Sequence, residues 1–267
     1  MAAGKENPKR KQEMSSFFAG IDIGSRTGKI VVIDNKKTIV HSALLPSTGG
    51  TAKTYDALFK TVDKTIKNNI ISTVATGYGR VALDDKVQKT ATEITCHYLG
   101  VTHFYPDIKT IIDIGGQDSK VITLDDNGNI HDFLMNDRCA AGTGRFLEVM
   151  ADRLGWTLQQ LSALDAQKLV PVRINATCTV FAESEVVSLL AQDTDVSIIA
   201  SSVAQMAAQY VFFMTQKLHG KAPLFMSGGV ASIRPVVYHL SQLIGAPIAI
   251  DNRSPLMGAM GAAILNI

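Results

Sequence analysis

The sequence has few cysteines, no long apolar run and no large surplus of either charge. Its three cysteines among 267 residues are too few for a disulfide framework, and an odd number cannot be paired completely within one chain. The net charge of +2 argues against a dedicated nucleic-acid binder. No apolar run approaches the roughly 18 residues that a membrane span needs, and no secretory signal follows the polar start. We therefore expect no membrane segment, no nucleic-acid partner and a cytoplasmic location.

What the sequence does contain is enough apolar material for a sizeable core. The hydrophobic fraction is 46%, and the length of 267 residues suits one large domain or two modest lobes. Residues 1–16 carry Lys and Arg but almost no apolar side chains, so we expect a disordered tail there. From Phe17 onward short apolar strands alternate with helical patterns, which indicates the α/β class. Helices are predicted over residues 51–68, 143–154, 181–190, 196–218, 234–244 and 255–265, and one more carries Val81, Val87, Ile94 and Leu99.

An internal repeat is the most informative pattern. The segment IDIGSRTGKIVVID recurs as IDIGGQDSKVITLD at a constant offset of 91 residues, so that Asp22 corresponds to Asp113 and Lys29 to Lys120. Each copy reads as a strand ending in Asp-x-Gly, a tight turn and a second strand. A repeat of this length is too long for a solenoid unit and predicts a duplicated α/β lobe.

Turns of this kind are suited to phosphate. Backbone N–H groups in a turn of Gly and small polar residues form a concavity that binds phosphate oxygens. Asp22 and Asp113 would repel bare phosphate but suit a magnesium ion and its waters, and Lys29 can place a positive charge on a phosphoryl group. The segment GSRTGK is not the common P-loop, because three residues separate its glycines and Ile30 stands where Ser or Thr is required.

A third glycine element, FMSGGVAS, places Gly228 and Gly229 between an apolar strand and a helical pattern. The two turns, this element and the terminal MGAMGAAIL resemble, in that order, the phosphate-1, phosphate-2, adenosine and connecting segments of the acetate and sugar kinase, Hsp70 and actin superfamily. That resemblance implies an actin/Hsp70-like (ribonuclease H-like) fold, in which ATP binds in a cleft between two duplicated lobes. We expect lobe I to comprise residues 17–107 plus 253–267, and lobe II residues 108–252.

The resemblance and the chemistry of the side chains together suggest roles in an ATP site. Gln117 or Asp118 is expected to orient or polarise the attacking water, with Asp113 as a further catalytic group. Arg26 departs from the small residues expected in the first turn, and either adds a phosphate contact or faces solvent. The residues expected to contact the nucleotide are Gly24, Ser25, Thr27, Lys29, Gly115, Gly116, Gly228 and Gly229.

Two of the cysteines directly precede helical patterns. Cys139 lies in NDRCAAGTGRFLEVM and Cys178 in NATCTVFAESEVV; a helix N-terminus favours the thiolate, which is the form that binds metal. Two thiolates cannot complete a four-cysteine iron–sulfur site, although a two-fold dimer supplies four. Taken alone, each cysteine is as easily a buried small apolar residue. Cys96, like His97 and His103, is expected to contribute only to packing.

The cysteine motifs resemble closely those of the ATP-dependent activators of 2-hydroxyacyl-CoA dehydratases, which are related to the ATPase subunits of benzoyl-CoA reductase. The resemblance extends from about Phe18 to the C-terminus. It implies a homodimer that uses ATP/ADP and Mg²⁺ and holds one [4Fe–4S] cluster between its subunits through Cys139 and Cys178 of each chain. It further implies transfer of one low-potential electron from ferredoxin or flavodoxin to a 2-hydroxyacyl-CoA dehydratase, or to a related acyl-CoA reductase.

Two other functions are compatible with the ATP motifs. One is a small-molecule (sugar) kinase of the same fold without a cluster, and the other is a non-catalytic ATP-dependent scaffold. The two helix-opening cysteines argue against the kinase, and the short chain leaves little room for a sugar-recognition domain.

Overall fold

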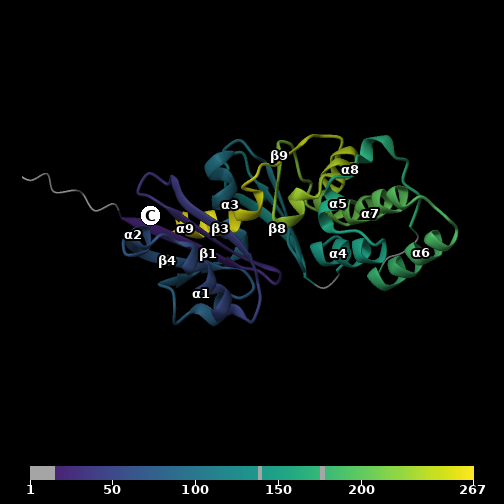
Figure 1. Cartoon of the computed structure of the whole chain (residues 1–267). Coiled ribbons are helices and arrows are strands. Elements are labelled where there is room, and N and C mark those ends of the chain that lie inside the picture. The colour runs from purple at the N-terminus through teal and green to yellow at the C-terminus, as the bar shows by residue number, and fades with distance from the viewer. Residues whose placement is uncertain (1–15, 138–139, 175–177) are drawn as a thin grey trace, which may run out of the picture.

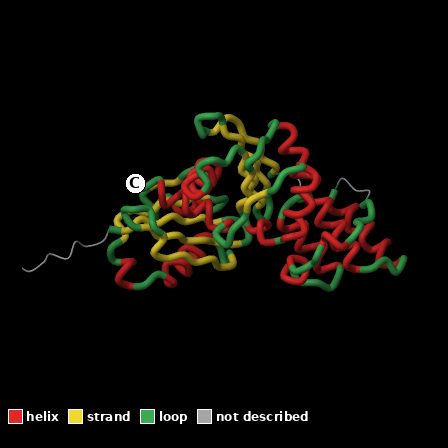
Figure 2. The backbone as a smooth tube through the Cα atoms, turned by 90° about the horizontal axis from the view of Figure 1, so that it is seen from above, coloured by secondary structure: helices red, strands yellow, loops and turns green. Residues whose placement is uncertain are grey.

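The computed structural model of the chain describes residues 16–137, 140–174 and 178–267. Its strands form two five-stranded sheets, ordered β3-β2-β1-β4-β5 and β10-β9-β6-β7-β8. Read from β8, the second sheet repeats the first strand by strand. In both, three antiparallel strands are followed by a parallel neighbour of the central strand. The duplication expected from the sequence is therefore confirmed (Figures 1 and 2).

The first sheet is built from the first copy of the repeat. Its central strands are apolar and almost wholly buried, as the sequence predicts. The predicted helix over residues 51–68 is two helices, because the backbone is extended at Val62, and Asp63 then caps the second helix by accepting a hydrogen bond from the Thr65 amide. The elements are β1 (Phe17–Ile23), β2 (Thr27–Ile33), β3 (Ile39–Pro46), α1 (Thr51–Thr61), α2 (Lys64–Lys67), β4 (Ile70–Thr76), η1 (Arg80–Leu83) and β5 (Lys89–Thr90).

The single helix predicted to carry Val81, Val87, Ile94 and Leu99 is wrong. That stretch contains the short helix η1, the two-residue strand β5 and then α3 (Glu93–Phe104). Helix α3 starts late because the Thr92 side chain caps it, accepting a hydrogen bond from the Thr95 amide at 3.2 Å. The apolar residues of three short elements thus happened to fall at spacings that resemble those of one long amphipathic helix.

The second sheet carries the second copy of the repeat and most of the helices (Figure 2). The elements that follow α3 in the chain are β6 (Thr110–Ile114), β7 (Ser119–Leu124), β8 (Ile130–Asn136), α4 (Gly144–Arg153), α5 (Leu158–Ser162), η2 (Ala166–Lys168), α6 (Thr179–Ala191), α7 (Val196–Lys217), β9 (Leu224–Ser227), η3 (Gly229–Ser232), α8 (Arg234–Ile244), β10 (Ile248–Ala249), η4 (Ser254–Leu256) and α9 (Met257–Ile264).

Helix α9 returns the chain to the first sheet, where its small residues allow very close packing (Figure 1). A Cβ atom added at Gly261 would lie 1.7 Å from the Cys96 carbonyl oxygen of α3, and one at Gly20 of β1 would lie 1.9 Å from the Ala259 carbonyl oxygen. Cys96 is fully buried at this contact, and its predicted packing role is confirmed. Burial raises the pKa of its thiol to about 12, so it is not a thiolate at neutral pH.

Helix α7 has the length and apolar composition of a membrane span, contrary to the expectation that no such segment exists. It is the one helix of this kind among the described residues. More than half of its apolar window is buried, and Val203, Ala207 and Val211 belong to the largest core cluster of the protein. A helix that other elements cover on most sides can be as apolar as a membrane helix. The burial of α7 in the core therefore accounts for its composition.

Candidate functional site

A cavity of about 790 Å³ lies where the turns of the two repeats face each other. This volume is in the range of nucleotide and cofactor sites. Residues of both sheets and of helices α3, α4 and α5 contribute to its wall. They include Asp22, Gly24, Ser25, Arg26, Thr27, Lys29, Glu93, His97, Asp113, Gly115, Gly116, Gln117, Asp118, Lys120, Glu148, Leu158, Gln159, Ser162, Gly228 and Gly229.

The β1–β2 turn brings the first aspartate and lysine together. Asp22 and Lys29 are paired across the two strands, and the Lys29 Nζ atom lies 3.2 Å from the Asp22 Oδ2 atom. The turn is closed by a 3.0 Å hydrogen bond from the Gly24 amide to the Thr27 carbonyl. The Gly24 amide is therefore engaged within the turn, so that this glycine shapes the phosphate-facing loop.

The β6–β7 turn repeats this arrangement. Asp113 and Lys120 are paired across the strands, and the Gly115 amide donates to the Asp118 carbonyl at 2.9 Å. The Lys120 Nζ atom lies 3.2 Å from Asp113 Oδ2 and 2.7 Å from Asp118 Oδ2. The equivalence of the two turns, expected from the 91-residue offset, is thus reproduced down to the aspartate–lysine pair.

Lys120 and Glu93 are site residues that the sequence reasoning missed. Lys120 is 1% exposed, and its ammonium group also lies 2.8 Å from the Glu93 Oε2 atom of α3. Burial by itself would lower the pKa of Lys120, but the attraction of Asp113, Glu93 and Asp118 outweighs burial and raises the pKa well above its ordinary value. The alignment of Lys120 with Lys29 was the signal that could have identified it.

Asp113 is charged although it is 2% exposed. Burial would raise its pKa, whereas the electrostatic effect of His97 and Lys120 and hydrogen bonds from Lys120 and Ser227 lower it to about 2. Such a carboxylate is available to hold a cation or its waters at neutral pH.

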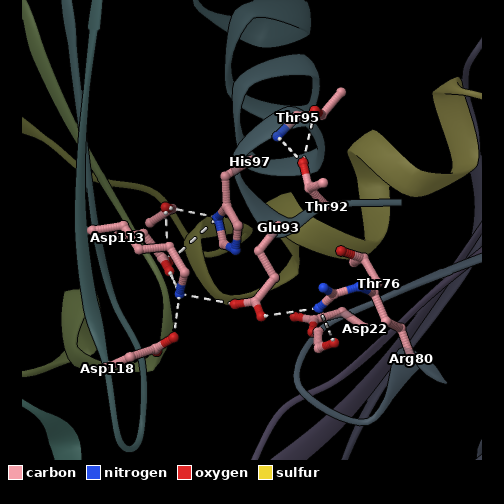
Figure 3. A network of polar contacts seen from close by, with 12 residues as sticks. Asp22, Thr76, Arg80, Thr92, Glu93, Thr95, His97, Asp113 and Asp118 are labelled. Carbon is pink, nitrogen blue, oxygen red and sulfur yellow. Dashed lines mark hydrogen bonds and ion pairs between the residues drawn. The ribbon is translucent and has the colours of Figure 1, made fainter. Parts of the chain in front are cut away.

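His97 was expected only to pack, and this expectation is incomplete. The side chain is buried, but its Nδ1 atom lies 3.0 Å from Ser227 Oγ and 3.3 Å from Asp113 Oδ1 (Figure 3). His97 thereby joins α3 to the carboxyl ends of β6 and β9 and helps to orient Asp113. His103, for which packing was also expected, is exposed.

The third glycine element borders the second turn. Gly228 has a φ of +84°, and a Cβ atom added there would lie 2.4 Å from the Ile114 carbonyl oxygen. Gly229, by contrast, has open space on the side where its Cβ would be. The cavity continues from these glycines between η3 and α5, a helix that the sequence reasoning did not place at the site; its cavity-lining residues are Leu158, Gln159 and Ser162.

The two cysteines predicted to bind the cluster differ in what the structure says of them. Cys178 is exposed and immediately precedes the first residue of α6. Cys139 lies outside the described residues. Within residues 16–137, 140–174 and 178–267, no group of three or more His, Cys, Asp or Glu side chains is arranged to hold a metal ion.

The duplicated sheets and the cavity between their turns define a two-lobed nucleotide-binding protein with the fold of actin and Hsp70. A glucokinase of the ROK family from Streptomyces griseus, solved with glucose and AMPPNP, shares this fold with a TM-score of 0.60 over 94% of this chain and 99% of that one, at 12% identity. At such low identity only the fold is shared. The chain belongs to the BadF/BadG/BcrA/BcrD ATPase family, which it matches over residues 19–266.

Two relatives within this family are similar over nearly their whole length. The chain is 39% identical to the 2-hydroxyisocaproyl-CoA dehydratase activator of Clostridioides difficile, covering 93% of this chain and 94% of that protein. It is 38% identical to the (R)-2-hydroxyglutaryl-CoA dehydratase activating ATPase of Acidaminococcus fermentans, covering 94% and 97%.

Solved structures of both kinds of activator resemble this chain. The A. fermentans dehydratase component A matches with a TM-score of 0.88 over 94% of this chain and 97% of that one, at 38% identity. The C. difficile activator, solved with bound ADPNP, matches with a TM-score of 0.86 over 93% of each chain, at 37% identity. The family resemblance seen in the sequence is therefore confirmed.

Proposed function

We propose that this chain is an ATP-hydrolysing iron–sulfur activator that passes one low-potential electron from ferredoxin or flavodoxin to a 2-hydroxyacyl-CoA dehydratase or a related acyl-CoA reductase. The observation that carries the proposal is one cavity faced by two Asp–Lys turns, in a chain whose relatives are named activators of such dehydratases.

The nucleotide is assigned to this cavity with its phosphates between the two turns. Ser25, Thr27 and Gly116 line the phosphate end, and Lys29 would contact a phosphoryl group in exchange for Asp22. Asp22 and Asp113 present buried carboxylate oxygens from opposite lobes, which is the donor chemistry that Mg²⁺ prefers, through its waters. A magnesium ion held there would neutralise phosphate charge. Gly228 and Gly229 border the adenosine end.

Gln117 is assigned to orient the attacking water. Its side chain is at the exposed tip of the β6–β7 turn, and an amide can donate to one oxygen while accepting from another. The Asp118 carboxylate already pairs with Lys120 at 2.7 Å. We therefore assign Asp118 to stabilising the turn and to polarising the water that Gln117 orients. Asp113 remains the charged group at the metal position.

The cluster is assigned to Cys139 and Cys178 of two subunits in a homodimer. Cys178 fits this role because its exposed thiol precedes a helix, where it is accessible to a second chain. The first turns of α6 also expose Val180 and Phe181, each 65% exposed, and Val187 follows on the same helix. Apolar side chains grouped beside a ligand cysteine are what an interface between copies would bury. The cluster would carry the transferred electron.

The two lobes provide the link between ATP and the cluster. We assign residues 17–107 plus 253–267 to lobe I and residues 108–252 to lobe II. Nucleotide between the turns favours one lobe angle, and hydrolysis removes the phosphate contacts that stabilise it, provided that the two angles differ in nucleotide affinity. A rotation of lobe II would move the helices that start at the cluster cysteines.

Iron and acid-labile sulfide analysis of anaerobically purified protein tests this function. We expect about four irons per dimer, lost in Cys139→Ser and in Cys178→Ser and retained in the matched control Cys96→Ala. Asp113→Asn should abolish ATP hydrolysis while leaving the absorption spectrum of the cluster intact. An iron-free protein that phosphorylates a sugar would contradict the proposal.

A further inference from the structure

Arg26 lies where the β1–β2 turn (residues 24–26) meets the β6–β7 turn (residues 115–118), and we call these two the phosphate turns. Its carbonyl accepts a 2.9 Å hydrogen bond from the Ser47 amide, and the Ser47 hydroxyl donates to the Gly24 carbonyl at 3.0 Å, so the backbone of the first turn is held on both sides. The aliphatic part of Arg26 then crosses to the second turn. A Cβ atom added at Gly116 would lie 2.4 Å from the Arg26 Cγ atom. Only glycine at position 116 leaves room for this path.

The guanidinium group of Arg26 ends on helix α4 of the opposite lobe. Its Nε atom lies 3.1 Å from Glu148 Oε1, and its Nη2 atom lies 2.9 Å from Glu148 Oε2. This two-pronged geometry fixes direction as well as distance, which a lysine would not do. Arg145, one turn earlier on α4, lies 3.2 Å from the same carboxylate and supports it from within the helix.

Helix α4 is also attached to the second phosphate turn. The Gly144 amide donates to the Gly115 carbonyl at 2.9 Å, and the Arg145 amide donates to the Gly116 carbonyl at 2.8 Å. The N-terminal end of α4 is thus tied to the β6–β7 turn. Glu148 of the same helix connects it to Arg26 in the β1–β2 turn. Arg26, Glu148 and the two turns surround the phosphate end of the cavity.

We propose that the Arg26–Glu148 ion pair is a clasp that closes the phosphate end of the cleft and limits the rate of nucleotide exchange. The clasp rests on the proposed function only in that a nucleotide occupies the cavity. It answers the question left open by the sequence: Arg26 neither faces solvent alone nor is committed to phosphate, but pairs with a carboxylate of the other lobe. Arg26 and Glu148 are positioning residues, because they act by holding the lobes.

The overall charge of the two lobes favours the same closure. Residues 17–107 and 253–267 contain 12 Lys and Arg against 8 Asp and Glu, whereas residues 108–252 contain 10 against 14. The lobes therefore carry net charges of +4 and −4 and attract each other across the cleft. This attraction and the half-exposed clasp are both weakened by salt.

The test is the dissociation rate of a fluorescent ADP analogue, mant-ADP, from the purified full-length protein without dehydratase or reductant. A failure to activate a dehydratase would thus leave this measurement unaffected. We expect Arg26→Ala and Glu148→Gln each to release mant-ADP about two- to fivefold faster, as the loss of a partly exposed ion pair predicts. The double variant should be no faster than either single variant, and the difference from the unaltered protein should shrink at high salt.

Arg145→Ala is the matched control, since it removes a cation from Glu148 without breaking a contact across the cleft; its release rate should stay within twofold of the unaltered protein. Thermal melting without nucleotide shows that each variant is folded. Unchanged release rates, or effects of the two single variants that add in the double variant, would overturn the clasp. So would faster release in Arg26→Ala alone, because Arg26 would then bind the nucleotide itself.

Discussion

At the scale of single residues, the two lysines of the repeat occupy the same position but have different surroundings. Among the described residues, Lys29 forms an ion pair with one carboxylate, that of Asp22, at 3.2 Å. Lys120 is surrounded by three carboxylates within 3.2 Å, one of them Glu93 from the other lobe, and is 1% exposed. The duplicated turn has therefore diverged: one lysine remains at the edge of the cavity, and the other has become the centre of a buried ionic network.

Replacing Lys120 should destabilise the protein strongly. In Lys120→Met the carboxylates of Asp113, Glu93 and Asp118 lose their common cation, and breaking a buried ion pair in this way costs about 3–5 kcal/mol. Urea unfolding of the nucleotide-free protein measures the loss. Lys29→Met is the matched control, with a smaller expected loss because one carboxylate is left unpaired; equal losses in the two variants would contradict the distinction.

The low pKa of Asp113 predicts a defined dependence of stability on pH. Because the folded-state pKa of about 2 lies below the ordinary aspartate pKa of 3.8, the charged form is favoured by folding. This stabilisation, of about 2 kcal/mol, is fully present above pH 4 and is lost as the pH falls through 2. Urea unfolding in EDTA between pH 5 and 2 should show a shallower decline in Asp113→Asn. A decline of the same steepness would exclude this role for Asp113.

At the scale of elements, the hairpins β1–β2 and β6–β7 were predictable, and the edge strands β3 and β8 beside them were not. An apolar run, a Gly-containing turn and a second apolar run are local signals. The edge strands β3 and β8 carry mixed sequences such as IHDFLMN and were not predicted. They are strands because the hairpins offer them hydrogen-bonding partners. The local sequence pattern thus located the two Asp-x-Gly turns, whereas the edge strands β3 and β8 depend on pairing with the hairpins.

The adjacent glycines between β9 and η3 should respond differently to the same substitution. Gly228→Ala forces a Cβ atom onto the Ile114 carbonyl at a positive φ, and should lower the free energy of unfolding by at least about 1–3 kcal/mol. Gly229→Ala meets open space in the nucleotide-free protein and should leave the melting temperature unchanged. It should instead reduce the stabilisation by added ADP, since the cavity lies there. Thermal melting with and without ADP distinguishes the two, and equal destabilisation would contradict this assignment.

At the scale of the whole molecule, the apolar face of α6 predicts how two copies associate. Phe181→Asp places a charge where we expect an interface, and should weaken dimerisation by at least about tenfold, with loss of iron from the shared site. Ile71→Asp alters a similarly exposed apolar residue on the first sheet (59% against 65% for Phe181) and should leave the dimer intact. Sedimentation of both variants measures this. A Phe181→Asp dimer as stable as the Ile71→Asp dimer would place the interface elsewhere.

The sequence by itself determined the duplication, the Asp-x-Gly turns, the third glycine element and the α/β class. Each of these is written in a few neighbouring residues or in their exact recurrence, so no folded context is needed to recognise it. Only the tertiary structure decided that Glu93 and His97 reach the site, that Lys120 is its most buried cation and that Arg26 pairs with Glu148. These partners are separated by up to 122 residues in sequence. They meet only because the two sheets face one cleft. Burial there strengthens the attraction between the charges, and neither the periodicity nor the spacing of the sequence shows which charges will pair.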